Sequence, residues 1–182
     1  RARLGPPVGV QATTQDAVLC VAREGLARVA ELAPERVRDF DPALHPTIGD
    51  VTRETSPQVH AILQLLPAKK APGKHRKVPV PLPEATGEVV GAYAALRRML
   101  AAREVAEGRP LRAEEPLLVG PTGGAMTRGQ MVGIFRAAAQ AIGLAPGEVT
   151  GHSGRIGGAT DHFAQDTPPA VLQICGRWDS DL

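Results

Sequence analysis

The side chains best suited to chemistry in this sequence are two arginines, each separated from a second polar residue by three positions. Arg155 follows His152 by three residues, and Arg28 precedes Glu31 by three. A guanidinium group can hold two oxygens of a phosphate through paired hydrogen bonds, and a histidine can exchange a proton near neutral pH. Residue types of this kind could therefore act at a phosphate group, among other roles.

Each of these residues taken alone also allows a plainer interpretation. Arg28 could pair with Glu24 or Glu31 on a solvated helix face, a contact worth only about 0.2–0.5 kcal/mol. His152 could be a helix-cap or surface histidine, and Trp178 could be a core residue. The chemical interpretation thus depends on the order and spacing of all of them together.

Positive charge gathers in one segment of the chain. Lys and Arg total 21 against 19 Asp and Glu, and a formal net charge of +2 does not by itself indicate nucleic-acid binding. The basic cluster consists of Lys69, Lys70, Lys74, His75, Arg76 and Lys77. It could follow a phosphate backbone, or it could be the solvated tip of a hairpin.

Apolar periodicity and turn residues divide the chain into helices and one hairpin. The predicted helices span 14–32, 84–107, 127–142, 151–163 and 168–176, and the predicted strands span 59–66 and 78–82. Thr127 and Gln130 match a capping box at the start of the third helix. Pro79 and Pro81 cannot donate hydrogen bonds to a neighbouring strand, so the second strand should lie at a sheet edge.

The same periodicity assigns particular side chains to the core. Ile156, Ala159 and Phe163 should point inward from the helix over 151–163. Tyr93 lies on an apolar stripe and should pack in the core. Arg28 falls on the rim of the apolar face of the first helix, so we expect it to be partly buried.

Length and composition are typical of one globular domain over residues 1–182. The elements above predict the class α+β, mainly helical, with a small antiparallel hairpin or sheet. No apolar run approaches the ~20 residues of a membrane helix and no secretory signal opens the sequence, so we expect an intracellular protein without membrane contact. Cys20 and Cys175 lie among apolar residues, which favours small buried thiols over a disulfide.

Four segments together resemble the tyrosine recombinases of the phage-integrase type. Residues 151–160 read GHSGRIGGAT and residues 171–178 read VLQICGRW. They are similar to the family's C-terminal motif, in which His-x-x-Arg and small residues precede an apolar helix that ends in Gly with His or Trp. Residues 25–32 resemble the family's first box, and residues 68–70 resemble the hairpin that carries its catalytic lysine. The resemblance spans 14–178 and is closest to integrase-like proteins of eukaryotic mobile elements.

This resemblance implies the tyrosine-recombinase catalytic-domain fold and a protein that breaks and rejoins DNA in site-specific recombination or integration. Arg28 and Arg155 would hold the oxygens of the scissile phosphate. His152 would support the same phosphate and assist proton transfer. Lys69 would protonate the departing 5′ oxygen, with Lys70 as the alternative.

Further contacts follow from the same resemblance. Either Arg177 or Trp178 would fill the place of the family's His or Trp. Lys70, Lys74 and Arg76 would contact DNA, the expected partner, on which several copies of the chain could assemble. No metal or other cofactor is implied, because the arginines and the lysine supply the positive charge. The expected location is the nucleus if the host is a eukaryote.

The sequence departs from the family's pattern at several points. Gly154 replaces the usual apolar residue between His and Arg, which costs helix stability and a core contact. The nucleophilic tyrosine of the family follows the Gly-His/Trp element by about two helical turns, but this sequence ends at Leu182. The only tyrosine, Tyr93, stands in the wrong order, and the family's N-terminal DNA-clamping domain is absent. We therefore expect this chain to bind DNA weakly and to cleave nothing as it stands.

Two other functions are compatible with the sequence. One is a non-catalytic DNA-binding or scaffold module that keeps the integrase fold. The other is an unrelated helical interaction domain. Salt-dependent DNA binding would separate the last from the other two, because phosphate contacts weaken steeply with salt.

Overall fold

The computed structural model describes residues 8–55, 60–66, 77–86 and 89–178. Its helices are α1 (Val8–Glu24), α2 (Val29–Leu32), α3 (Ala92–Glu107), α4 (Arg128–Ala141), α5 (Ser153–Ala164) and α6 (Pro169–Gly176). Its strands are β1 (Val51–Glu54), β2 (His60–Leu65), β3 (Val78–Pro83), β4 (Ala85–Thr86) and β5 (Val89–Val90). The predicted class, α+β and mainly helical, is confirmed.

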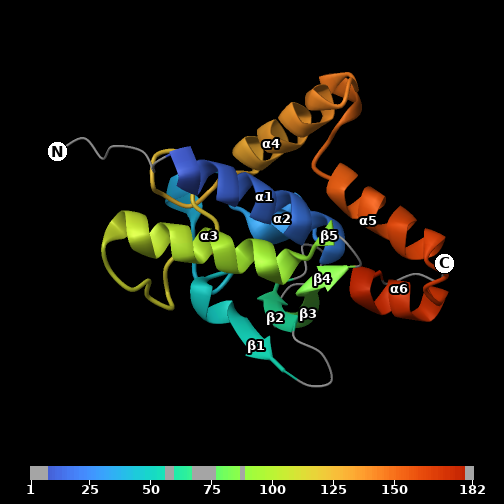
Figure 1. Ribbon diagram of the computed structural model, residues 1–182, viewed down its shortest axis with the longest axis horizontal. Helices are drawn as coiled ribbons and strands as arrows, with labels where there is room; N and C mark the ends of the chain where they lie inside the picture. The colour runs from blue at the N-terminus through green and yellow to red at the C-terminus, as the bar shows by residue number, and fades with distance from the viewer. Residues whose placement is uncertain (1–7, 56–59, 67–76, 87–88, 179–182) are drawn as a thin grey trace.

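Helix α1 is central to the core. It packs along α3 and, near its C-terminal end, against α5 (Figure 1). Val18, Val21 and Ala22 on its inner face are fully buried. Because buried apolar area is the main source of stability, this face fixes the position of the helices that surround it.

The prediction of one continuous helix over 14–32 is wrong. Helix α1 ends at Glu24, the chain turns through Gly25 and Leu26, and a separate short helix, α2, follows. A Cβ on Gly25 would lie 2.7 Å from the Val21 carbonyl oxygen, so only glycine permits this turn. Leu26 adopts a left-handed conformation with φ of 45°. The break removes Arg28 from the helix face and places it as the N-cap of α2.

The predicted hairpin is confirmed. Strands β2 and β3 pair antiparallel with Leu63 opposite Val80. The strand order β1-β2-β3 puts β3 at the edge of its sheet, as Pro79 and Pro81 require. Strand β1 and the pair β4–β5 were not predicted, because β1 is largely exposed without alternation and the other two are only two residues long.

Helix α3 starts later than the predicted range of 84–107, because β4 and β5 precede it. The Glu24 carboxylate on α1 accepts a hydrogen bond of 2.6 Å from the N–H of Ala92 and so caps the start of α3. Gly108, with φ of 64°, ends the helix. Tyr93 is buried, as predicted.

The capping box at the start of α4 is also present. The N–H of Thr127 donates to the Gln130 side chain at 2.8 Å, and the N–H of Gln130 donates to the Thr127 hydroxyl at 3.3 Å. Met131 and Phe135 point from this helix into the core.

Helices α5 and α6 span nearly the predicted residues, but α5 turns a different face inward. Ile156 is 62% exposed and Phe163 is 73% exposed, so their predicted inward orientation is wrong. The buried residues of α5 are Arg155 and Gly158. A Cβ on Gly158 would lie 1.9 Å from an α1 carbonyl oxygen, and one on Gly154 would lie 3.0 Å from an α1 methyl group. Close approach to α1 therefore explains why glycine, not a larger apolar residue, stands at position 154.

Cys20 and Cys175 are each half-buried and are not joined to one another by a disulfide. Burial raises the pKa of both, which keeps them protonated at neutral pH. In the described ranges, no helix has the length and apolar character needed to cross a membrane.

Candidate functional site

A cavity of about 990 Å³ lies between the turn that follows α1 and helices α5 and α6. It is lined by four residues predicted to be catalytic: Arg28, His152, Arg155 and Trp178. The other lining residues are Ala30, Ile156, Ala159, Thr160, Phe163, Pro169 and Leu172. Arg28 and Arg155 are thus brought to one cavity although they are far apart in the sequence.

Arg155 is anchored on the buried side of α5. One terminal nitrogen donates to the Leu26 carbonyl oxygen at 2.7 Å, and the other donates to the Gly176 carbonyl oxygen. Its guanidinium carbon lies 5.0 Å from the ring centre of Trp178. Since the group has five N–H donors, these two hydrogen bonds leave others for a ligand.

The charge of Arg155 is only partly compensated by its surroundings. Burial, and then repulsion from Arg28 and Arg177 against some attraction to Glu31, lowers its pKa to about 10. The guanidinium still carries its charge at neutral pH. An anion that entered the cavity would relieve both the burial cost and the repulsion.

Arg28 and Glu31 form a mutual pair at the start of α2. The N–H of Arg28 donates to Glu31 at 2.9 Å, and its guanidinium donates to the other carboxylate oxygen at 2.9 Å. The Arg28 side chain is 16% exposed, which agrees with the prediction of partial burial. The Glu31 side chain is fully buried, so the alternative of a pair on a solvated face is wrong.

Arg177 and Trp178 have different surroundings in the structure. Trp178 lies at the cavity beside Arg155. Arg177 is not among the cavity's lining residues, and its guanidinium donates to the Glu31 carboxylate at 2.7 Å. Trp178 is therefore the one placed to meet a ligand.

One buried carboxylate forms ion pairs with two of the arginines at this site. Glu31 pairs with both Arg28 and Arg177. Burial opposes the ionisation of Glu31, but the charge and hydrogen bond of Arg177, followed by the backbone and side-chain hydrogen bonds of Arg28, outweigh it and lower the Glu31 pKa. Together with Arg155, three guanidinium groups surround one carboxylate. The described side chains thus leave an excess of positive charge beside the cavity, which suits a phosphate.

Comparison with models of known protein families and with curated proteins finds no match.

His152 lies on the rim of the cavity at the N-cap of α5 and is exposed. Hydrogen bonds between Thr150 and Ser153 shape this turn: the N–H of Thr150 donates to the Ser153 hydroxyl at 2.9 Å. The N–H of His152 donates to the Thr150 hydroxyl at 3.2 Å. His152 is accessible at the rim, where the positive end of the α5 dipole adds to the field.

The predicted lysine and DNA contacts lie outside the described residues. These are Lys69, Lys70, Lys74 and Arg76. Lys77, at the edge of the same basic cluster, is held by Asp50 at 2.6 Å and by the carbonyl oxygen of Pro42 at 2.9 Å. Its charge is therefore compensated within the fold.

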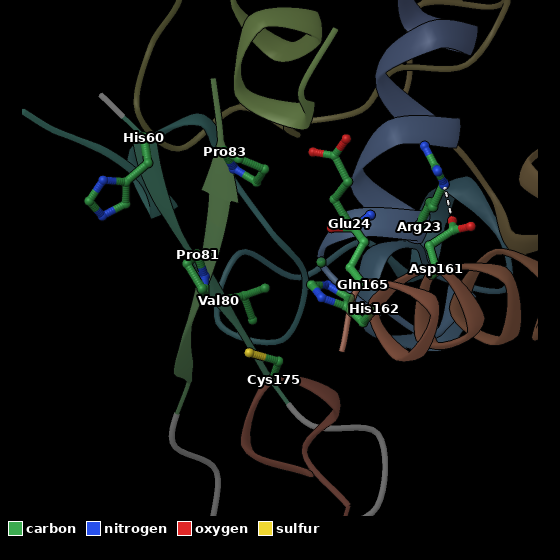
Figure 2. Close-up of a pocket in the computed structure, with 12 residues that line it drawn as sticks. Arg23, Glu24, His60, Val80, Pro81, Pro83, Asp161, His162, Gln165 and Cys175 are labelled. Atoms are coloured by element: carbon green, nitrogen blue, oxygen red, sulfur yellow. Dashed lines mark hydrogen bonds and ion pairs between the residues drawn. The ribbon is translucent and has the colours of Figure 1, made fainter. Parts of the chain in front are cut away.

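A second, smaller cavity of about 270 Å³ lies on the other side of α5. Figure 2 shows Arg23 and Asp161 side by side at one edge of this cavity, where they form an ion pair of 2.5 Å. His60 points away from this pair, on the far side of β3. Because the arginine is paired with an aspartate here, this cavity lacks the excess positive charge of the larger one.

Two features of the larger site could not be predicted from the sequence. The Arg-x-x-Glu spacing pointed to Glu31, but nothing in it indicated that Arg177 shares the same carboxylate. The carbonyl oxygen of Leu26, which accepts from Arg155 and Arg177, gave no signal at all. Backbone acceptors depend on the path of the chain, not on residue type.

Proposed function

We propose that this chain is a tyrosine-recombinase catalytic domain, which binds DNA and holds a scissile phosphate in the cavity between the α1–α2 turn and helices α5 and α6. The observation that carries the proposal is the excess of guanidinium groups over carboxylates at a cavity lined by Arg28, His152, Arg155 and Trp178.

In the proposed role, Arg28 and Arg155 donate to the two non-bridging oxygens of the phosphate. These oxygens gain negative charge as a nucleophile attacks, so donors already fixed in place stabilise the transition state more than the ground state. Trp178 packs on the Arg155 guanidinium and restricts its orientation. His152, on the rim, exchanges the proton of the attacking hydroxyl.

The leaving-group role belongs to residues outside the described part of the chain. Lys69, or Lys70, protonates the leaving 5′ oxygen. Tyr93 is buried on α3 and does not line the cavity. In this proposal the residues that line the cavity bind and activate the phosphate, and Tyr93 is not the nucleophile.

DNA binding tests the proposal directly. The affinity for a labelled duplex would be measured by fluorescence anisotropy over a series of salt concentrations, for the wild type, Arg28→Met and Arg155→Met. Loss of one charge-assisted phosphate contact should weaken binding roughly tenfold or more and reduce the salt slope by about 1. Arg112→Met is the matched control, because Arg112 is exposed, lies far from the cavity in the chain and does not line it. Binding that is equal in all four proteins would refute the proposal.

A second function, DNA binding without chemistry, is favoured by the burial of the only tyrosine. The two are separated with an aryl ester of a nucleotide and an added nucleophile such as hydroperoxide, whose attack releases a phenolate that can be followed by absorbance. Acceleration that Arg155→Met abolishes supports phosphate activation. DNA binding without acceleration supports the second function.

A further inference from the structure

Arg177 has a backbone conformation that is unfavourable for its residue type. At the end of α6 it adopts φ of 56° and ψ of 43°, in the left-handed region where glycine is usual. Strain of this kind persists only where the surroundings hold the residue in place. The contacts of the Arg177 side chain therefore need an explanation beyond the ending of a helix.

These contacts reach both flanks of Arg28 in the chain. On one flank, Arg177 donates to the carbonyl oxygens of Gly25 at 3.2 Å and Leu26 at 3.1 Å. On the other flank, it donates to the Glu31 carboxylate at 2.7 Å. The Arg177 side chain is only 8% exposed, and it does not line the cavity.

The segment that Arg177 holds is also strained. Leu26 is fully buried with φ of 45°, and its carbonyl oxygen accepts hydrogen bonds from both Arg155 and Arg177. The turn that carries Arg28 to the cavity is thus fastened on one side to α5 and on the other to the end of α6.

We infer that Arg177 is a positioning residue, which links the end of α6 to both flanks of Arg28 and fixes the Arg28 guanidinium at the cavity without touching the ligand. This inference rests on the proposed phosphate site. The seating of α6 then determines whether Arg28 is in place to bind an anion.

A double-mutant cycle in DNA affinity tests the inference. Wild type, Arg28→Met, Arg177→Met and the double variant would be compared by anisotropy with the same labelled duplex. Each single substitution should weaken binding roughly tenfold, and the double variant should bind no more weakly than Arg28→Met alone. If Arg177 contacted DNA itself, adding its substitution to Arg28→Met would cost roughly a further tenfold and reduce the salt slope by about 1, which would overturn the inference.

The conservative variant Arg177→Lys separates position from charge. Lysine keeps the charge but lacks the planar fork that donates to Leu26 and Glu31 together. We expect Arg177→Lys to lose most of the affinity that Arg177→Met loses. Full wild-type affinity in Arg177→Lys would overturn the inference.

Unfolding equilibria of the same four proteins give a readout that requires no DNA. Because Arg28 and Arg177 share Glu31, their substitutions should be coupled by at least about threefold in the unfolding constant. Additive effects would contradict the proposed link. If the wild type bound no DNA, the proposed function would fail, and this second cycle would still decide whether Arg177 positions Arg28.

Discussion

Replacing Glu31 by glutamine removes the one carboxylate that two arginines share. The Glu31 side chain is fully buried and accepts from the guanidinium groups of Arg28 at 2.9 Å and Arg177 at 2.7 Å. Glutamine is nearly the same size and keeps one acceptor oxygen. It replaces the other oxygen with an NH₂ group, so a donor then faces a donor.

The expected loss of stability follows from the buried charges that remain. Removing one partner of a buried ion pair costs about 3–5 kcal/mol, because the other charge stays buried without compensation. The retained acceptor of Glu31→Gln favours the lower end, about 3 kcal/mol at pH 7. For a chain of this length, that loss lowers Tm by roughly 6–12 °C.

The difference should also depend on pH in a defined direction. The pKa of Glu31 in the folded protein is lower than its ordinary value of 4.5. Its contribution to stability is therefore fully present above the unfolded pKa and is lost as the pH falls through the folded pKa. The gap between wild type and Glu31→Gln should stay constant from pH 7 down to about 5 and shrink below about 4.

Urea unfolding followed by circular dichroism at several pH values measures this gap. Glu114→Gln is the control, since its side chain is 64% exposed and the change should stay within about 0.5 kcal/mol. A loss below about 1 kcal/mol at pH 7, or a gap that does not shrink in acid, would refute the reasoning that Glu31 is a buried, ionised partner.

Three further predictions concern α5, the core and the cavity. Gly158→Ala should lower the free energy of unfolding by more than about 3 kcal/mol, because its Cβ would lie 1.9 Å from an α1 carbonyl oxygen. Gly157→Ala has no atom within 4 Å of its Cβ and should raise the free energy of unfolding by up to about 1 kcal/mol. Thermal unfolding of the two variants checks this. Phe135→Ala should cost about 3–5 kcal/mol and Phe163→Ala less than about 1, since these rings are 5% and 73% exposed; similar losses in urea would contradict the assigned faces. Inorganic phosphate at ten times its Kd should stabilise the wild type by about 1.4 kcal/mol and leave the stability of Arg155→Met unchanged. Equal shifts in the Tm of the two proteins would mean that the anion binds away from Arg155.

The sequence allowed most of the elements to be predicted, because their signals are local. The capping box of Thr127 and Gln130 and the end of the second predicted helix at residue 107 were both confirmed. The edge position of β3 followed from Pro79 and Pro81, whose missing N–H groups leave few alternatives.

The errors arose where distant segments decide the outcome. Apolar periodicity pointed Ile156 and Phe163 inward, but the face of α5 with Gly154 and Gly158 packs against α1 because it alone allows close approach. The continuous helix over 14–32 was predicted from apolar periodicity, which does not register the strained turn at Leu26. That turn is stabilised by donors from α5 and from the end of α6.

Residue types did predict which side chains meet at the cavity, though not how they are held. His-x-x-Arg and Arg-x-x-Glu supplied Arg28, His152 and Arg155, all of which line it. The sharing of Glu31 by Arg177 depends on the path of the chain after α6, and no spacing in the sequence encodes it.

Trp178 gives the protein a built-in optical reporter. It is the only tryptophan in the chain, and the only tyrosine is buried on α3. Red-edge excitation therefore yields emission from a single indole, which lies 5.0 Å from the Arg155 guanidinium at the edge of the candidate site. An anion that draws Arg155 toward itself changes the field on that indole, so occupancy can be followed by intrinsic fluorescence without a label.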